Sequence, residues 1–262
     1  MKLSISNIAW GADVDTTVYE MMKKNGFSAL EIAPTRIFPQ APYDRTDEAR
    51  LWSERLREEY GFFVSSMQSI WYGRSEKLFG TAEERGALVE YTKKAIHFAE
   101  AIGCRNLVFG CPRNRVIPEG MCDDTAVEFF REMGNYAFSH NTVLSIEANP
   151  PIYNTNYING TPEAFSLIKR VQSPGFLLNL DVGTMIHNNE SVGVLEGNVG
   201  YINHVHISEP NLVPLKKREI HAELMRALKR EDYRGAVSIE MSNQGSLTAL
   251  EDALAYVKEI FG

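Results

Sequence analysis

The sequence predicts an α/β protein that folds as a single (β/α)8 TIM barrel domain over residues 1–262. Short apolar segments typical of β-strands alternate with segments of helical periodicity from one end of the chain to the other. Eight segments of each kind in about 260 residues is the number that this barrel needs. No Pro-, Gly- or Ser-rich linker divides the chain. An open, doubly wound sheet is the alternative, but the Gly-rich phosphate turns that would favour it, GxGxxG and GxxxxGK(S/T), are absent.

The predicted strands are short runs rich in apolar residues. They cover 3–9, 29–34, 62–70, 106–110, 142–148, 176–182, 203–208 and 236–241. Longer non-helical stretches follow the second, third, fourth, fifth and seventh strands, at 34–42, 71–80, 111–120, 149–160 and 209–215. Loops that follow the strands lie at the C-terminal face of such a barrel, where active sites are built.

Several predicted helices carry signals at their ends. The first helical segment ends near Gly26, which suits the residue just beyond a helix C-terminus. Thr81 opens a TAEE sequence, the pattern of a capping box. Thr161 is predicted as an N-cap, with Pro162 at the first helical position. The segment 246–261 has the periodicity of an amphipathic helix.

Composition limits the classes of function. The net charge of −7 repels a phosphate backbone and argues against nucleic-acid binding. No apolar run approaches the ~20 residues that cross a bilayer, and the N-terminus alternates apolar and polar residues like a strand, so neither a membrane span nor a signal peptide is expected. Cys104, Cys111 and Cys122 lack CxxC spacing, and their odd number suggests reduced thiols in a cytoplasmic protein.

Four predicted strands in the second half of the chain end on residues that bind metals. These residues are Glu147, Asp181, His206 and Glu240. In a parallel barrel all four side chains emerge at the same end, where three carboxylates and an imidazole would bind one divalent metal ion, such as Mn, Mg, Co or Zn. Each residue alone could instead cap a turn or pair with a lysine, but four at matching strand ends favour the metal site.

Glu147 and Glu240 are the predicted catalytic residues. Each ends a strand in the same phrase, S-I-E, and a glutamate on each side of a bound polyol suits proton removal next to a carbonyl. A metal that polarises the carbonyl would stabilise the resulting enediolate. His204 shares a face with His206 but lies deeper, and it is predicted to pack or to support the ligand. No chemical role is expected for His97, His140, His187 or His221.

Further polar and aromatic residues are placed to contact a hydroxylated substrate. Trp71 could stack on a sugar face or pack in a lid, and Arg113 and Arg115 could hold a carboxylate or phosphate or remain solvated. The predicted substrate-binding residues are Glu31, Gln68, Trp71, Arg113, Asn149, Thr184 and Glu209.

The order of the four predicted ligands resembles the xylose isomerase-like barrel superfamily, and the similarity covers nearly the whole chain. This superfamily includes sugar-phosphate isomerases/epimerases, ketose 3-epimerases, hydroxypyruvate isomerase and inosose dehydratase. In the epimerases the matching positions bind manganese, cobalt or magnesium, and the two glutamates transfer protons. The epimerases usually have a histidine where this chain has Thr184 and an arginine where it has Leu212. The metal ligands therefore match better than the substrate-binding residues.

The sequence thus predicts a metal-dependent isomerase or epimerase of a small sugar, a sugar phosphate or a related hydroxy-carbonyl compound. Its expected partner is a small carbohydrate substrate, with a homodimer possible and no nucleic acid or membrane. An inosose-dehydratase-like lyase and a carbohydrate-binding barrel that has lost catalysis are the alternatives. The trinuclear-zinc endonucleases of the superfamily need a richer set of histidines than the six of this chain.

Overall fold

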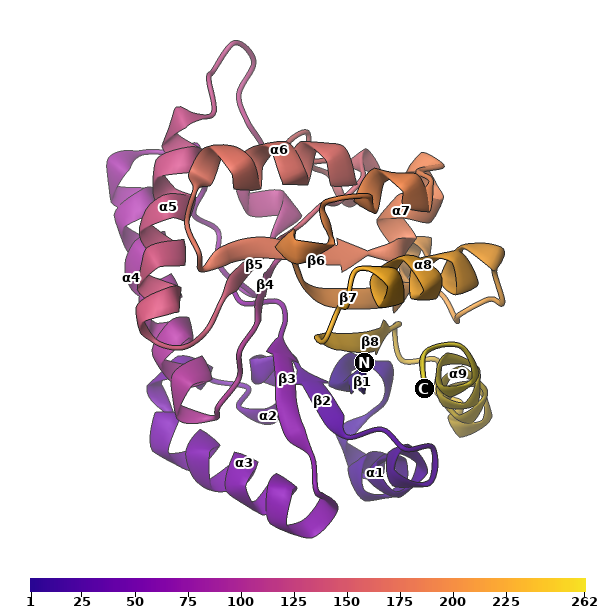
Figure 1. The fold of residues 1–262 in the computed structure, drawn as a ribbon. Helices are drawn as coiled ribbons and strands as arrows, with labels where there is room; N and C mark the ends of the chain where they lie inside the picture. The colour runs from indigo at the N-terminus through magenta and orange to yellow at the C-terminus, as the bar shows by residue number, and fades with distance from the viewer.

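The strands of the protein close into one parallel barrel in sequence order, as the sequence predicts (Figure 1). A computed structural model describes all residues, 1–262. Strand β1 pairs with β8 as well as with β2, which closes the sheet. The strands are β1 (Lys2–Ser6), β2 (Ala29–Ile32), β3 (Phe63–Met67), β4 (Leu107–Phe109), β5 (Leu144–Glu147), β6 (Phe176–Asp181), β7 (Ile202–Ser208) and β8 (Ala236–Glu240).

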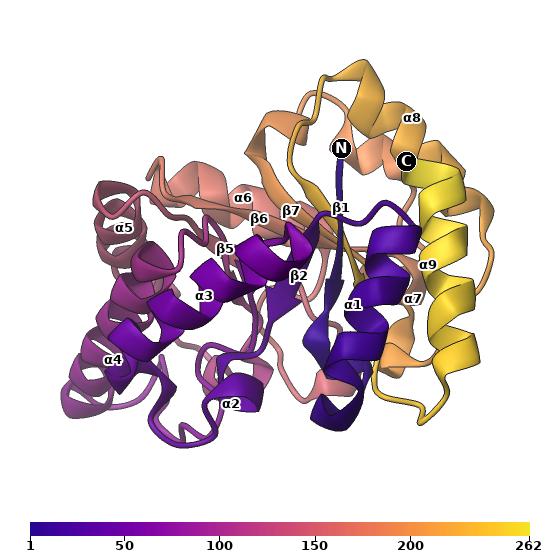
Figure 2. The same cartoon turned by 90° about the horizontal axis from the view of Figure 1, so that it is seen from below.

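Helices surround the barrel and bury its apolar outer surface (Figures 1 and 2). They are α1 (Asp15–Lys24), α2 (Pro34–Ile37), α3 (Thr46–Tyr60), α4 (Ala82–Ala101), α5 (Asp124–Ser139), α6 (Thr161–Val171), α7 (Val182–Asn188), α8 (Glu219–Arg230) and α9 (Leu247–Phe261). The short helix α2 lies in the loop after β2, so the prediction that residues 34–42 are non-helical is wrong for its first four residues. No helix is both long enough and apolar enough to cross a membrane.

Most of the predicted helix ends are confirmed. Gly26 lies just beyond the α1 C-cap with a φ of +76°, a conformation that glycine adopts without steric cost. At the start of α4, the Glu84 amide donates to Thr81 Oγ1 (3.3 Å) and the Thr81 amide donates to Glu84 Oε2 (2.9 Å), which completes the capping box. Ser246 caps α9 by accepting from the amide of Ala249 (3.2 Å).

The predicted N-cap at Thr161 is wrong by one residue. Gly160, in an extended conformation, is the N-cap of α6, and Thr161 is the first helical residue. The Thr161 amide donates to Glu190 Oε1 (3.1 Å). A carboxylate from a distant loop therefore replaces the local side-chain cap, and such a long-range contact has no signal in the local sequence.

Polar side chains inside the barrel form hydrogen bonds with one another towards the N-terminal ends of the strands. Asn106, just before β4, accepts hydrogen bonds at Oδ1 from Ser145 Oγ on β5 (2.6 Å) and from Asn203 Nδ2 on β7 (2.7 Å). Its amide group donates to Ser66 Oγ on β3 (2.9 Å). One side chain thus links strands on opposite sides of the barrel, below the residues at the C-terminal strand ends.

Candidate active site and metal centre

The four predicted metal ligands meet at the C-terminal ends of β5 to β8. Strand register places Asp181 beside His206, and Glu240 beside Ser208, two residues beyond His206. One candidate ligand atom from each of Glu147, Asp181, His206 and Glu240 lies within 4.8 Å of the other three. All four side chains are largely or fully buried, so the low-dielectric surroundings strengthen the interactions among their charges.

The imidazole of His206 has a defined orientation. Its Nδ1 faces the cluster, 2.9 Å from Glu147 Oε1 and 3.2 Å from Glu240 Oε2. Its Nε2 lies 2.9 Å from Glu31 Oε2, on the opposite side of the ring. A metal-binding histidine commonly donates its second N–H to a carboxylate, which fixes the ring and makes the first nitrogen a better ligand. Nδ1 is therefore the candidate ligand atom.

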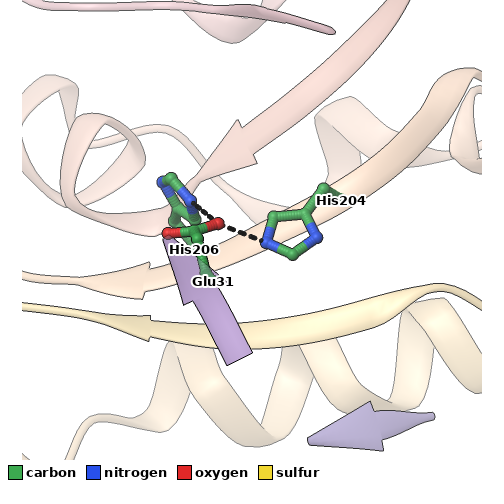
Figure 3. Close-up of side chains that lie close together, drawn as sticks. All are labelled: Glu31, His204 and His206. Carbon is green, nitrogen blue, oxygen red and sulfur yellow. Dashed lines mark hydrogen bonds and ion pairs between the residues drawn. The ribbon is translucent and has the colours of Figure 1, made fainter. Parts of the chain in front are cut away.

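Glu31 lies beneath the cluster, where it contacts both histidines of β7 (Figure 3). Its Oε2 is 2.8 Å from His204 Nε2 and 2.9 Å from His206 Nε2, and all three side chains are buried. Burial alone would raise the pKa of Glu31, but His206 and His204 lower that pKa below its usual range. Glu31 is not part of the cavity wall, so the structure places this predicted substrate-binding residue behind the candidate ligand. His204 is packed, as expected.

The cluster carries an excess of negative charge. Burial and the nearby carboxylate of Glu147 raise the pKa of Asp181. Burial, with Glu147 and Asp181 contributing, raises the pKa of Glu240 to about 7. Burial opposes protonation of His206, but Glu31 and Glu240 raise its pKa well above the ordinary value. Three carboxylates clustered around one imidazole thus favour an added positive charge, and this donor set fits a divalent cation.

Glu147 is held by two amide donors. Asn179 Nδ2 donates to Glu147 Oε1 (2.7 Å), and Asn149 Nδ2 donates to Glu147 Oε2 (3.0 Å). Behind Asn149, Arg115 Nη2 donates to Asn149 Oδ1 (2.9 Å). Arg115 is fully buried, and burial lowers the pKa of its guanidinium to about 10. These hydrogen bonds fix the orientation of the Glu147 carboxylate.

The carboxylates of Glu240 and Asp181 accept hydrogen bonds from different groups. The Gln68 amide nitrogen lies 3.0 Å from Glu240 Oε1 and 2.7 Å from Glu31 Oε1, in the orientation that satisfies both carboxylates. Asp181 is the N-cap of α7, and its Oδ2 accepts from the backbone amide of Thr184 (2.8 Å). Thr184 is almost fully buried, so the structure places this predicted substrate-binding residue as a support for Asp181.

A cavity opens above the cluster. Among the predicted site residues it is lined by Glu147, Asp181, Glu240, Gln68 and Asn149. Sequence reasoning missed Tyr153 and did not place Leu212 in a wall; both belong to loops that follow β5 and β7. Tyr153 stands six residues after Glu147, and its position in that loop was the available signal. The remaining lining residues are Ser69, Val108, Gly110, Cys111 and Pro112.

Besides Glu31 and Thr184, three more predicted substrate-binding residues lie outside this cavity. Trp71 is buried, with Nε1 donating to Thr92 Oγ1 (2.9 Å) and its ring 4.5 Å from that of Phe109. Arg113 lines an adjacent, more open cavity with Trp71. Glu209 is buried and accepts from Arg218 Nε (2.7 Å) and Nη2 (2.6 Å), which ties the loop after β7 to the start of α8. The two cavities share Ser69, Cys111 and Pro112.

Fold and site together define a (β/α)8 barrel protein with an acidic, histidine-containing cluster at the ends of its last four strands. The family model described as "Xylose isomerase-like TIM barrel" matches residues 19–260, and the chain belongs to this family. The superfamily expected from the sequence is thereby confirmed. No curated protein sequence matches the chain.

Solved structures share the fold at low sequence identity. D-psicose 3-epimerase crystallised with D-fructose has a TM-score of 0.80 and 19% identity, with 100% of each chain covered. The 3-keto-D-glucoside 4-epimerase of E. coli has a TM-score of 0.76 and 18% identity over 99% of each chain. A protein described as a family 2 AP endonuclease from Brucella melitensis has a TM-score of 0.75 and 20% identity over 98% of each chain. At these identities the likeness establishes the fold alone.

Proposed function

We propose that this protein is a divalent-metal-dependent isomerase or epimerase that moves a proton next to a carbonyl in a small sugar, a sugar phosphate or a related hydroxy-carbonyl compound. One observation carries the proposal: Glu147 and Glu240 both line the cavity, and both approach the same nitrogen of His206. Two carboxylates around one small cavity can serve as base and conjugate acid on a single bound substrate.

The donor set supports one metal ion, which would be Mn, Mg, Co or Zn. Glu147, Asp181, His206 Nδ1 and Glu240 would hold it. When bound, the cation supplies a positive charge that polarises the carbonyl and neighbouring hydroxyl of the substrate. Glu31 and Thr184 orient the ligands from behind, through His206 Nε2 and Asp181 Oδ2.

The surroundings of the two glutamates differ, which supports different starting roles. Glu147 accepts from the amides of Asn149 and Asn179, which hold its carboxylate as the group that takes the proton from carbon. Glu240 accepts from one amide, that of Gln68, and is the group that returns a proton to the enediolate. In the reverse direction the roles exchange. General acid–base steps of this kind contribute roughly 10²–10⁴-fold in rate.

The cavity wall supports a polar substrate. Gln68, Asn149 and Tyr153 offer amide and hydroxyl groups to substrate hydroxyls. Two structural neighbours are named for epimerisation of psicose and of a keto-glucoside, which supports a carbohydrate. Thr184 and Leu212 stand where the epimerases usually have histidine and arginine, so substrate contacts here differ from theirs. A cytoplasmic location and a homodimer remain predictions.

The test is deuterium incorporation from D2O into a panel of ketoses and sugar phosphates. We expect exchange at the carbon beside the carbonyl, its loss on chelation, and its recovery when a divalent ion is returned. Glu240→Gln should abolish conversion of the substrate to its epimer or isomer while the circular dichroism spectrum and melting temperature stay unchanged, because the amide keeps the shape but cannot carry the proton. The matched control is Glu58→Gln, an exposed glutamate of α3, which should exchange and convert the substrate at the wild-type rate.

Product analysis separates the alternatives. A product that has lost water would assign an inosose-dehydratase-like lyase, which shares the initial deprotonation. Binding of a sugar without any exchange would assign a barrel that binds carbohydrate but does not catalyse. Unfolding of Glu240→Gln would make Glu240 a structural residue and refute the mechanism.

A further inference from the structure

A second group of potential metal ligands lies on the outer face of the molecule, where α4 and α5 run side by side (Figure 1). His97 and Glu100 are on α4, and His140 directly follows α5. Glu100 Oε2 is 2.9 Å from His140 Nδ1 and 3.8 Å from His97 Nδ1. One ligand atom of each residue lies within 4.8 Å of the other two. This His–Glu–His group is separate from the cluster at the strand ends.

The distances suit tetrahedral coordination of zinc. Ligand atoms each about 2 Å from Zn²⁺ are roughly 3.3 Å apart in a tetrahedron. The two measured separations from Glu100 Oε2 fall on either side of that value. Small rotations of exposed or half-exposed side chains would therefore complete the geometry, with water in the fourth position.

Tyr136 of α5 orients one of the imidazoles. Its Oη lies 2.8 Å from His97 Nε2, and its ring packs against both histidine rings, with centroid distances of 5.7 and 4.5 Å. When the Nε2–H of His97 donates to this hydroxyl, the lone pair lies on Nδ1, the nitrogen that faces Glu100. A hydrogen bond on the far nitrogen is the usual support of a metal-binding histidine.

The local charges favour a cation. Glu100 forms ion pairs only with His97 and His140, and no lysine or arginine neutralises it. Helix α4 ends at Ala101 and α5 ends at Ser139, so the C-terminal ends of both helices lie beside the group. Unsatisfied carbonyl groups give a helix C-terminus a partial negative charge.

We propose that His97, Glu100 and His140 form a Zn²⁺ site that links α4 to α5. Two imidazole nitrogens and one carboxylate are a borderline donor set that suits zinc, whereas Mg²⁺ prefers oxygen ligands alone. Its ligands come from two neighbouring helix ends, so its role is to tie together two helices whose ligands lie about 40 residues apart. An ion that binds only the folded state stabilises it by mass action.

The test counts zinc bound to the full-length protein after equilibrium dialysis against micromolar Zn²⁺. The double variant His97→Gln/His140→Gln should bind one equivalent less than the wild type, whatever the strand-end cluster binds. Glu100→Gln should bind zinc more weakly, because it keeps the shape of the side chain but removes its charge. The matched control is His187→Gln, an exposed histidine of α7, which should bind as much zinc as the wild type.

Anomalous diffraction at the zinc edge locates the ion. A peak between the three side chains of the wild type, absent from the double variant, is the expected result. Equal zinc content in the wild type and the double variant, or a peak elsewhere on the surface, would overturn the proposal. Deuterium exchange by the double variant should match that of the wild type, so failure of this site and failure of the proposed enzyme activity are distinguishable.

Discussion

Arg115 is a buried cation with no carboxylate partner. Its side chain is fully buried, and its Nε and Nη1 atoms form no hydrogen bond. Its Nη2 donates a hydrogen bond to Asn149 Oδ1, which orients the amide nitrogen of Asn149 toward Glu147. A buried charge without an ion pair costs stability. This cost, together with the hydrogen bond to Asn149, indicates a role in orienting the site.

Replacing Arg115 by methionine should separate activity from stability. In Arg115→Met the Asn149 amide loses its partner, and we expect deuterium exchange to fall about tenfold, the effect of losing ~1.4 kcal/mol of transition-state stabilisation. The melting temperature should be unchanged or higher, because an apolar side chain of similar volume replaces an unpaired buried charge. Parallel exchange assays and thermal melts measure both effects. Arg55→Met, an exposed arginine of α3, is the control and should exchange normally; an equal loss there would contradict the role of Arg115.

For single residues, the sequence predicts which side chains stand at the strand ends, but not which partners those side chains contact. Glu147, Asp181, His206 and Glu240 could be found because a residue at the C-terminal end of a barrel strand faces one common site. Glu31 also ends a strand, yet it points beneath the cavity and contacts His206 on a strand across the barrel. Such contacts depend on rotamers and on barrel closure, which a single sequence does not encode locally.

At the scale of helices and strands, two glycines have opposite effects on stability. Gly175, just before β6, packs against α5 so closely that a Cβ there would lie 2.8 Å from the Phe138 amide nitrogen and closer still to the Gly134 carbonyl oxygen. Gly86 lies on the exposed side of α4, with nothing within 4 Å of an added Cβ. The first glycine permits a helix–strand contact, whereas the second only weakens a helix.

Alanine substitutions at these glycines should change stability in opposite directions. Gly175→Ala should lower the free energy of unfolding by ~1–3 kcal/mol, because backbone atoms of α5 must move. Gly86→Ala should raise it by ~0.5–1 kcal/mol, because alanine restricts the unfolded chain and favours the helix. Urea unfolding of both variants measures the two effects. Stabilisation by Gly175→Ala would show that the contact is not tight.

Element boundaries could be predicted where the signal is local. The capping box of α4 and the glycine after α1 are sequence patterns with a fixed geometry, and both were found. The start of α6 was misplaced because Glu190, about 30 residues away, satisfies its first amide. The short helix α2 has only one turn, too little for helical periodicity to appear.

At the scale of the whole molecule, stability should depend on pH through His221. This side chain is buried between α8 and α9, with Nδ1 2.9 Å from Tyr256 Oη. Burial, the main cause, lowers its pKa from 6.5 to about 4. The unfolded chain therefore binds a proton between pH 6.5 and about 4 that the folded protein does not. The stabilising contribution is complete above pH 6.5 and is lost as the pH falls through this window.

The variant His221→Gln should be less sensitive to acid. Between pH 7 and pH 4 we expect the wild type to lose up to ~3 kcal/mol more unfolding free energy than this variant, since each pKa unit corresponds to about 1.4 kcal/mol. Urea titrations at several pH values measure the difference. His140→Gln, at an outer helix end, serves as control in zinc-free buffer. Identical pH dependence of the wild type and His221→Gln would remove His221 as the cause.

The closed barrel itself could be predicted because the number of strand and helix segments admits few arrangements. What the sequence could not give is the distribution of roles within it. All four candidate metal ligands come from β5 to β8, while β3 and β4 and the loops that follow them supply Gln68, Val108 and Cys111 to the cavity wall.

That division has an evolutionary consequence. Mutations in the amino-terminal half of the gene can reshape the entrance and the wall while the reactive groups, encoded in the other half, keep their positions. Glu31, Gln68 and Arg115 are exceptions, since they reach from the first half to His206, Glu240 and Asn149. Drift or recombination confined to the first half, with these three residues retained, is therefore a route by which such a scaffold acquires a new substrate without rebuilding its chemistry.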